Sequence, residues 1–292
     1  MAAVEPVDSN SRLDEQILGL DSLDLPGFGR TPLWRKAWST VWPKLAALLL
    51  GLAIWQLLAS SGWKPSYLLP GPGTVFSHVW DDRHPLASGL LTTLQRAAGY
   101  YALALLFGTV VAILVTRART IRAAVVPLAT GLQSMPSVAW VPIAILLFGV
   151  RTQAILFVTL AGSIPAVVIG TVSALDSVPP ILVRAGDVLG ARGFALYRHV
   201  LLPAALPGYL SGARQAWAFA WRSLMAGELI VSAKGTTSLG QLLSAYQDQS
   251  LAADVLAVML AILAVGLLMD ALVFSRLEQL ALRRRGLAAA PA

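Results

Sequence analysis

The stretch from Arg184 to Pro203 reads RAGDVLGARGFALYRHVLLP and stands between two apolar segments of the chain. It lies within the connecting segment Asp176–Pro207, which is much longer than the about two to eight residues that usually connect neighbouring helices in a bundle. Pro179 and Pro180 can begin a helix just before it, and Gly190 can end that helix. A second short amphipathic helix is predicted around Phe194–Leu202. The stretch therefore predicts a helix–turn–helix that a separate protein can bind.

The composition around this stretch predicts a membrane protein. Of the 292 residues, 57% are hydrophobic and 13% are charged, whereas soluble domains carry about 25% charged residues. The runs Leu45–Ala59, Ala102–Val115 and Ala252–Met269 approach the roughly 20 apolar residues that cross about 30 Å of hydrocarbon. The chain has no cysteine, which excludes disulfides and thiolate metal sites. A net charge of +7 can indicate nucleic-acid binding, but here the basic residues flank apolar spans, which favours topology signals and anionic headgroups.

The apolar periodicity predicts an all-α fold with six transmembrane helices. The third span contains three prolines, which remove backbone donors, so we expect it to be kinked or broken and packed within protein. Small residues recur every four positions in the fourth and fifth spans, which predicts close helix packing. The predicted spans are Pro43–Ser61, Thr92–Thr116, Ala123–Gly149, Gln153–Leu175, Pro207–Ser232 and Ala252–Ser275.

The positions of Lys and Arg predict the orientation, because cytoplasmic loops are enriched in basic residues. One face collects the basic residues of both tails, of the turn after the second span and of the loop 176–206. The other face has only Lys64, Arg83, Arg151 and Lys234. We therefore expect both termini in the cytoplasm of a cell whose plasma (inner) membrane holds the protein. The predicted domains are a disordered tail over 1–40, a six-span domain over 41–277 and a basic tail over 278–292.

The loop also resembles that of a known family. Permeases of binding-protein-dependent ABC importers carry Glu-Ala-Ala, three residues, Gly, nine residues, then Ile-x-Leu-Pro, and this chain has the same spacing. Two positions differ, because Arg184 stands where the family usually has glutamate and Gly186 where it has alanine. The alternative is an interfacial helix whose glycine and proline match by chance. The ATPase-docking positions that the resemblance implies are Arg184, Ala185, Gly186, Gly190, Val200, Leu202 and Pro203.

The resemblance implies a type I ABC importer permease fold whose cytoplasmic coupling helix fits a groove on an ATPase. It implies a second copy of the permease, two ATPase subunits and an extracytoplasmic binding protein as partners. The charge at Arg184 is opposite to the usual one, so the usual acidic contact is not carried over to this chain. Two segments, Leu69–Val75 and Met135–Pro142, are similar to signatures of the sulfonate, taurine and nitrate permeases. That branch implies a small organosulfonate, taurine or nitrate as substrate, chosen largely by the binding protein.

Ionisable residues inside a span are costly and indicate functional sites. Arg222 lies near the predicted midplane, where its guanidinium either meets an anion in transit or pairs with a carboxylate. Glu228 lies about 120° from it around the helix, so pairing within that helix is awkward. Arg214 lies closer to the cytoplasmic end and is interpreted as structural, whereas Asp254 and Asp270 are interpreted as interfacial. The predicted pathway residues are Arg222, Trp221, Trp217, Glu228, Pro136 and Pro142.

Several of these residues have a second interpretation. Trp217 and Trp221 stand four apart, so they stack on one helix face, as core packing or as a pore lining. Pro136 and Pro142 free backbone carbonyls, which suits a gate without requiring one.

Other functions lack the residues that they need. The sequence has no Gly-x-x-x-x-Gly-Lys-Ser/Thr segment to cradle phosphate, so we expect ATP and Mg²⁺ on a separate ATPase and no cofactor on this chain. The three histidines form no zinc motif, and no serine sits in a Gly-x-Ser-x-Gly elbow, so we expect no catalytic activity. An ion-coupled secondary transporter stays open as the alternative, with Glu228 as its one candidate for a carboxylate relay.

Overall fold

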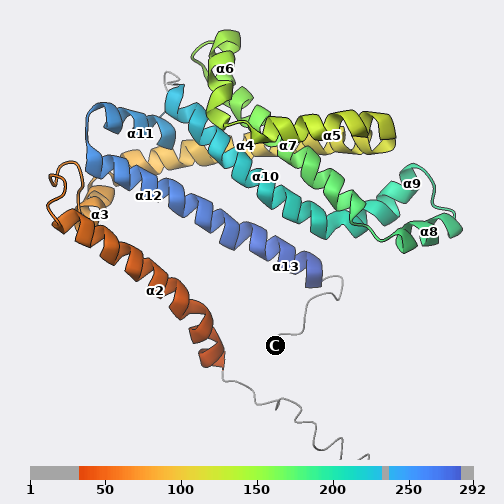
Figure 1. Cartoon of the computed structure of the whole chain (residues 1–292), viewed down its shortest axis with the longest axis horizontal. Coiled ribbons are helices and arrows are strands. Elements are labelled where there is room, and N and C mark those ends of the chain that lie inside the picture. Colours follow the sequence, from red (N-terminus) through yellow and green to blue (C-terminus); the bar gives the residue numbers. More distant parts are fainter. Residues whose placement is uncertain (1–32, 232–236, 284–292) are drawn as a thin grey trace, which may run out of the picture. The chain divides into compact units, whose positions relative to one another are not determined.

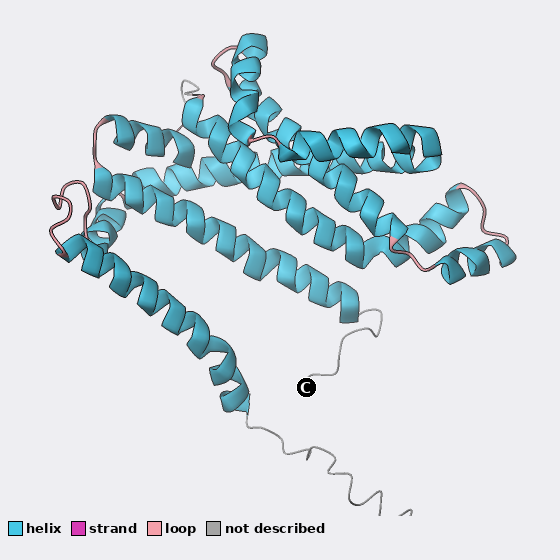
Figure 2. Cartoon of the chain, viewed as in Figure 1, coloured by secondary structure: helices cyan, strands magenta, loops and turns pink. Residues whose placement is uncertain are grey.

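The computed structural model describes residues 33–231 and 237–283, and all regular structure in these ranges is helical (Figure 2). The chain forms two compact units, residues 1–58 and 59–292. The first contains most of α2 (Leu33–Ser60). Most described side chains of α2 are exposed within the unit, although the segment Val41–Ser60 is apolar enough to cross a membrane. This helix therefore needs lipid or other protein around it.

The second unit is a bundle built around one central helix. α7 (Thr152–Asp176) is the most buried of the apolar helices and packs against α4, α5 and α10 (Figure 1). The main helices are α4 (Arg83–Arg117), α5 (Arg119–Ser134), α7, α10 (Leu202–Ile230) and α12 (Ala252–Met269), which continues through η3 (Asp270–Phe274) into α13 (Ser275–Arg283).

Glycines bring α7 and α10 into backbone contact. A Cβ atom added at Gly170 would stand 2.8 Å from the Cα of Gly212. Along the same interface, a Cβ at Gly208 would meet Ala174, and a Cβ at Gly227 would meet Ile155. Residue numbers rise along α10 as they fall along α7, so the two helices run antiparallel over nearly their full lengths. The predicted packing faces of the fourth and fifth spans are confirmed.

The third predicted span is broken. α5 ends at Ser134, and a single 3₁₀ turn, η1 (Ser137–Trp140), leads into α6 (Val141–Phe148) at an angle of 103° to α5. Pro136 stands at the break, where its ring removes a backbone donor and disfavours helical geometry at Met135. The expectation that prolines interrupt this span is confirmed.

Length and apolarity alone identify fewer spans than six. Among the described residues, four helices are long and apolar enough to cross a membrane, or five if α5 and α6 count as one bent span. The missing span is α10, whose 29 residues include Arg214, Arg222 and Glu228. Because α10 runs antiparallel along α7, it lies at the same depth as that apolar helix.

Two short helices and the ends of the chain differ from the predicted layout. α3 (Pro72–Asp81) and α11 (Leu239–Asp248) were not expected. α2 begins at Leu33, inside the predicted tail over 1–40, and α13 extends to Arg283, inside the predicted tail over 278–292. Residues 1–32 and 284–292 of these tails lie outside the described residues, as does Ser232 at the end of the fifth predicted span.

Candidate functional site

The loop between α7 and α10 is a helix–turn–helix, as its sequence predicts. α8 (Pro180–Val188) begins at the second of two prolines and is followed by a turn at Gly190, whose φ of +81° favours glycine. α9 (Phe194–Leu196) and a π-helical turn, η2 (Tyr197–Leu201), then run directly into α10. Because η2 and α10 are continuous, a movement of the loop also moves the first turn of α10.

The loop has two arms, α8 and the segment α9–η2. Gly186 lies where these two arms touch. It is buried, and an added Cβ would stand 2.9 Å from Cδ1 of Leu196 and 3.0 Å from Cγ2 of Val200. The backbone amide of Ala191 donates to the Gly186 carbonyl at 2.9 Å, which closes the turn. The glycine in place of the family's usual alanine therefore fits a tighter contact between the arms.

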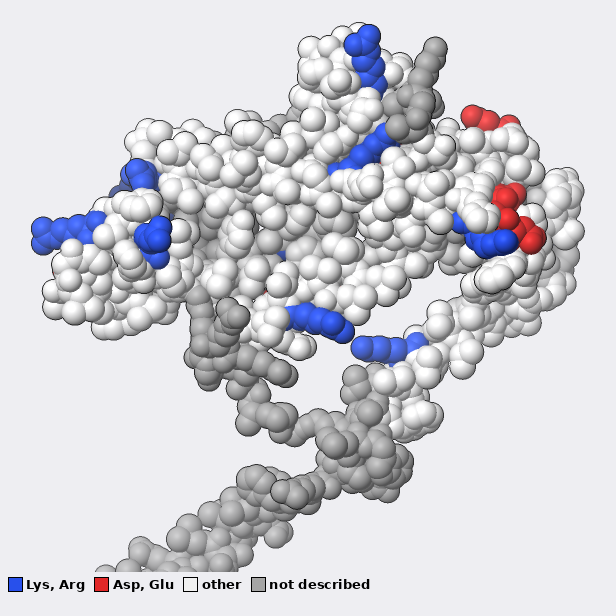
Figure 3. Space-filling view, turned by 180° about the vertical axis from the view of Figure 1, so that it is seen from behind, with Lys and Arg blue, Asp and Glu red and all other residues white. Residues whose placement is uncertain are grey.

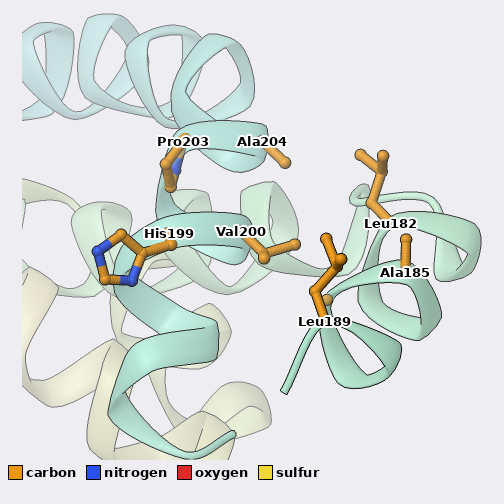
Figure 4. Close-up of a pocket in the computed structure, with 8 residues that line it drawn as sticks. Leu182, Ala185, Leu189, His199, Val200, Pro203 and Ala204 are labelled. Carbon is orange, nitrogen blue, oxygen red and sulfur yellow. The ribbon is translucent and has the colours of Figure 1, made fainter. Parts of the chain in front are cut away.

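A shallow groove of about 360 Å³ runs between the two arms of the loop (Figure 4). Four of the predicted docking residues line it: Ala185, Gly186, Val200 and Pro203. The other three, Arg184, Gly190 and Leu202, are exposed on the loop outside this lining. The predicted docking residues thus lie together on the projecting loop formed by α8, α9 and η2, called the α8–α9 knob below, at one end of the bundle.

Two exposed apolar residues extend this knob, and they were not among the predicted docking residues. Val188 and Leu189 are 87% and 85% exposed, which is costly for large apolar side chains unless a partner covers them. A sequence signal was available, because Leu182, Ala185 and Leu189 follow one face of a helix at spacings of three and four.

Charge differs between the two ends of the bundle. In the space-filling view, several basic side chains lie over the end that carries α8 and α9, and others lie elsewhere on the bundle. The visible acidic ones lie at the opposite end, near α3 and α11, with a basic side chain beside them (Figure 3). At that opposite end, Tyr246 of α11 donates to Asp82 Oδ2 at 2.8 Å. Burial of the Tyr246 side chain, and to a smaller extent its hydrogen bond to Asp82, raises the pKa of Tyr246 to about 12. The hydroxyl therefore keeps its proton, and with it this hydrogen bond, at neutral pH.

Among the predicted pathway residues, Arg222 lies on an exposed stripe of α10. The stripe follows helical spacing and consists of Ser211, Gln215, Ala218 and Arg222. The Nε of Arg222 donates to the Ala218 carbonyl at 3.1 Å, and its guanidinium lies 4.6 Å from the ring centroid of Phe219. No ion pair involves Arg222 within the described part of the chain. Its charge is therefore held at the surface without a neutralising carboxylate there.

Pro136, at the break between α5 and α6, and Pro142, in the first turn of α6, are also exposed. Ser137, in the same break, lies 2.8 Å from Ser223 of α10 through their hydroxyl oxygens. The broken span therefore contacts α10 one residue from Arg222, so these three predicted pathway residues belong to neighbouring elements.

The other predicted pathway residues lie inside the bundle. Trp217 and Trp221 are buried and stack with their ring centroids 5.9 Å apart, which favours the core-packing interpretation of this pair. Glu228 is fully buried, and Arg96 of α4 donates to it at 3.0 Å. Sequence reasoning missed Arg96, although an arginine inside an apolar span was itself a signal. We therefore do not place these three residues on an exposed pathway surface.

The remaining ionisable residues join helices. Arg214 donates from Nε and Nη2 to the two carboxylate oxygens of Asp270 at 2.5 and 2.6 Å, and from Nη1 to Glu278 at 3.2 Å. This geometry fits the structural role predicted for Arg214. Asp254 lies in the first turn of α12, at an end of the sixth span, where its buried side chain lies 2.7 Å from His78 Nδ1 of α3.

Comparison with known proteins identifies the family. The model of the family "Binding-protein-dependent transport system inner membrane component" matches residues 104–279, more than half of the chain. The chain belongs to this permease family. The match includes the whole α8–α9 loop, and it confirms the resemblance drawn from the spacing of residues 184–203.

Individual relatives agree with this assignment. The chain is 32% identical to the bicarbonate transport system permease protein CmpB of Synechococcus elongatus, over 81% of this chain and 88% of that protein. It is 31% identical to the riboflavin transport system permease protein RibX of Chloroflexus aurantiacus, over 70% and 76%. A chain of the MetNI methionine ABC transporter in an inward-facing conformation has a similar fold, with a TM-score of 0.58 and 21% identity, over 69% of this chain and 98% of that one. The predicted fold class is confirmed.

Proposed function

We propose that this chain is the membrane-spanning subunit of an ATP-driven importer that carries a small oxyanion across a bacterial inner membrane. The observation that supports it most is the α8–α9 knob, because its exposed apolar residues stand on a rigid helix pair continuous with α10. In a permease of this family, such a knob suits docking to an ATPase, which would bind ATP and Mg²⁺. Transport would follow alternating access, as closure of the ATPase moves α10 as a rigid body.

A second copy of the chain would complete the pathway. The exposed stripe of α10 includes Ser211, Gln215 and Arg222, and polar side chains at membrane depth face protein or water rather than lipid. A partner permease that faces this stripe would enclose an aqueous path between the two copies. Two ATPase subunits and an extracytoplasmic binding protein complete the proposed assembly. The basic loop end is assigned to the cytoplasm, together with both termini.

The substrate we propose is an oxyanion of the sulfonate, taurine, nitrate or bicarbonate type. The first three come from the resemblance of Leu69–Val75 and Met135–Pro142, and bicarbonate comes from the relative of that name. All present negatively charged oxygens, which a guanidinium binds through paired N–H donors. Arg222 is the residue we assign to this contact, because it is exposed on α10, eight residues before the end of that helix, and has no ion-pair partner among the described residues.

We expect Arg222→Ala to reduce anion uptake by about 10- to 100-fold, because hydrogen bonds to charged groups contribute about 1.5–3 kcal/mol. Arg222→Lys should keep part of the uptake, since it retains the charge but not the paired donors. The measurement is uptake of labelled taurine, an alkanesulfonate, nitrate, bicarbonate and riboflavin into proteoliposomes that contain the chain, its ATPase and its binding protein.

Arg83→Ala is the matched control for this experiment. Arg83 also donates to a backbone carbonyl, that of Trp80 at 3.0 Å, and its guanidinium also lies over a ring, at 5.3 Å from the Trp80 centroid. It lies at the first residue of α4, away from the stripe. Wild-type anion uptake by Arg222→Ala would remove Arg222 from the pathway, and preferred uptake of riboflavin would overturn the oxyanion assignment.

An ion-coupled secondary transporter is the rival function. It needs a carboxylate that can gain and lose a proton or cation during transport, and Glu228 was its candidate. The buried ion pair of Glu228 with Arg96 does not favour such a role. Uptake by the chain alone under an ion gradient, without ATPase or ATP, would support the rival and overturn the importer.

A further inference from the structure

Glu228 is the centre of a polar cluster inside the bundle. It lies in the last turn of α10, with none of its surface exposed. Arg96, 8% exposed, donates from Nη1 to Glu228 Oε1 at 3.0 Å, and the hydroxyl of Thr93 donates to Oε2 at 2.9 Å. Both partners belong to α4, so one carboxylate ties the end of α10 to α4.

The same cluster caps α11. The first backbone amides of a helix have no partner within the helix. Here the Leu239 amide donates to the Thr93 hydroxyl at 2.9 Å, and the Gly240 amide approaches Glu228 Oε2 at 3.4 Å. Ser238, at the capping position, makes no cap bond, and its buried hydroxyl has no partner among the described residues. The first turn of α11 is therefore capped by side chains of α4 and α10.

α11 packs closely against both α10 and α4. A Cβ added at Gly240 would stand 2.5 Å from the Glu228 Cβ and 2.8 Å from its carbonyl carbon. On the other side, a Cβ added at Gly89 of α4 would stand 2.8 Å from Leu242 Cδ1 of α11. α11 thus rests directly on α10 and α4, and the cluster fixes its first turn to both.

α10 connects this cluster to the α8–α9 loop. Its 29 residues correspond to about 43 Å of helix at 1.5 Å per residue. One end continues from η2 of the loop, and the other carries Glu228, at the opposite end of the bundle (Figure 1). A displacement applied at the loop can therefore reach α11 through the far end of α10, against which α11 packs.

We propose that Glu228 is a positioning residue that makes α11 move as one body with the end of α10, through Thr93 and Arg96. Motion that the ATPase imposes on the loop is then transmitted to α11 at the extracytoplasmic end. This inference rests on the proposed importer function. It assigns Glu228 to coupling between ATP hydrolysis and transport rather than to contact with the anion.

The test uses two variants that break the cluster in different ways. Glu228→Gln removes the charge that neutralises Arg96, whereas Thr93→Val keeps the ion pair and removes only the hydroxyl that joins Glu228 to the Leu239 amide. The second variant keeps the proposal testable if the first fails to fold. Thr159→Val is the matched control, because Thr159 is also buried but donates only to Ile155 of its own helix, at 2.8 Å.

The chain has no cysteine, so spin labels can be placed at two introduced cysteines. Gln153→Cys lies in α7 near Ile155, which packs against Gly227 at the end of α10, and Gln247→Cys lies in α11. Both positions are exposed. Distances are measured by electron paramagnetic resonance on the full-length chain with its ATPase in proteoliposomes, without nucleotide and with ADP–vanadate. The wild type and Thr159→Val should each give one narrow distribution that is the same in both states. Thr93→Val and Glu228→Gln should each broaden the distance distribution between the two labels and make it differ between the two nucleotide states.

The second readout is the amount of labelled taurine, nitrate and bicarbonate taken up per ATP hydrolysed. Both cluster variants should lower this ratio while ATP hydrolysis continues, which a loss of folded protein would not produce. A narrow distribution in folded Thr93→Val and Glu228→Gln overturns the proposal, as does an unchanged uptake per ATP. Absence of ATP-driven uptake by the wild-type complex is a different failure, because it removes the importer function itself and with it any coupling role for Glu228.

Discussion

Replacing Leu189 by glutamate is expected to separate the permease from its ATPase. Leu189 is 85% exposed beside Val188 on the α8 arm of the loop, and burial of a leucine contributes about 1.5–3 kcal/mol. The variant loses that contribution and would also bury a carboxylate in the interface. Because about 1.4 kcal/mol corresponds to a factor of ten in affinity, binding of the ATPase should weaken by more than about tenfold. ATP-driven uptake should fall with it. Copurification of the ATPase with the tagged permease measures the first effect, and proteoliposome uptake measures the second.

Leu189→Met is the matched control, because it keeps an apolar side chain of similar volume at the same exposed position. It should copurify with the ATPase like the wild type. Leu189 is exposed in this chain, so neither substitution should change the thermal unfolding temperature of the permease alone. Retention of the ATPase by Leu189→Glu at the wild-type level would show that the knob is not the docking surface.

The second large effect is expected at Gly170. An added Cβ would stand 2.8 Å from the Cα of Gly212, and a backbone atom cannot move aside as a side chain can. Gly170→Leu must therefore separate α7 from α10 along the most extensive helix interface of the bundle. Overpacking costs about 1–3 kcal/mol in a well-packed core, and loss of the neighbouring contacts adds to this. We expect a large fall in the unfolding temperature in detergent and little folded protein in the membrane.

Gly131→Leu provides the comparison for that variant. Gly131 also lies within an apolar helix, but an added Cβ would meet nothing within 4 Å. Removal of a glycine from a helix interior stabilises the helix by up to about 1 kcal/mol, so this variant should unfold at or above the wild-type temperature. Equal stability of Gly170→Leu and Gly131→Leu would contradict the close α7–α10 contact.

The loop from Arg184 to Pro203 could be predicted in detail because its structure is local. Two prolines at one end, glycine at the turn and apolar residues at helical spacing act within a few residues of one another. Its family could be recognised for the same reason, since the spacing of the matched positions is a property of the chain itself. The role of Gly186 could not be predicted, because it depends on Leu196 and Val200, which reach it only when the two arms pack together.

Glu228 shows the opposite case. The sequence places it in a span and marks it as costly, which led to its prediction as a pathway residue. Only the bundle brings Arg96 and Thr93 against it, from positions more than 130 residues earlier in the chain. Trp217 and Trp221 differ again, because their stacking follows from spacing, whereas their burial follows from which face of α10 meets its neighbours.

The sequence by itself therefore determined the membrane-embedded helical class, the broken third span, the loop and its family. Each of these depends on composition or on contacts between residues close in the chain. The tertiary structure decided which ionisable residues are paired inside the bundle and which, like Arg222, stay exposed. The physical reason is that the cost of a charge at membrane depth depends on its nearest partner, and here those partners come from other helices.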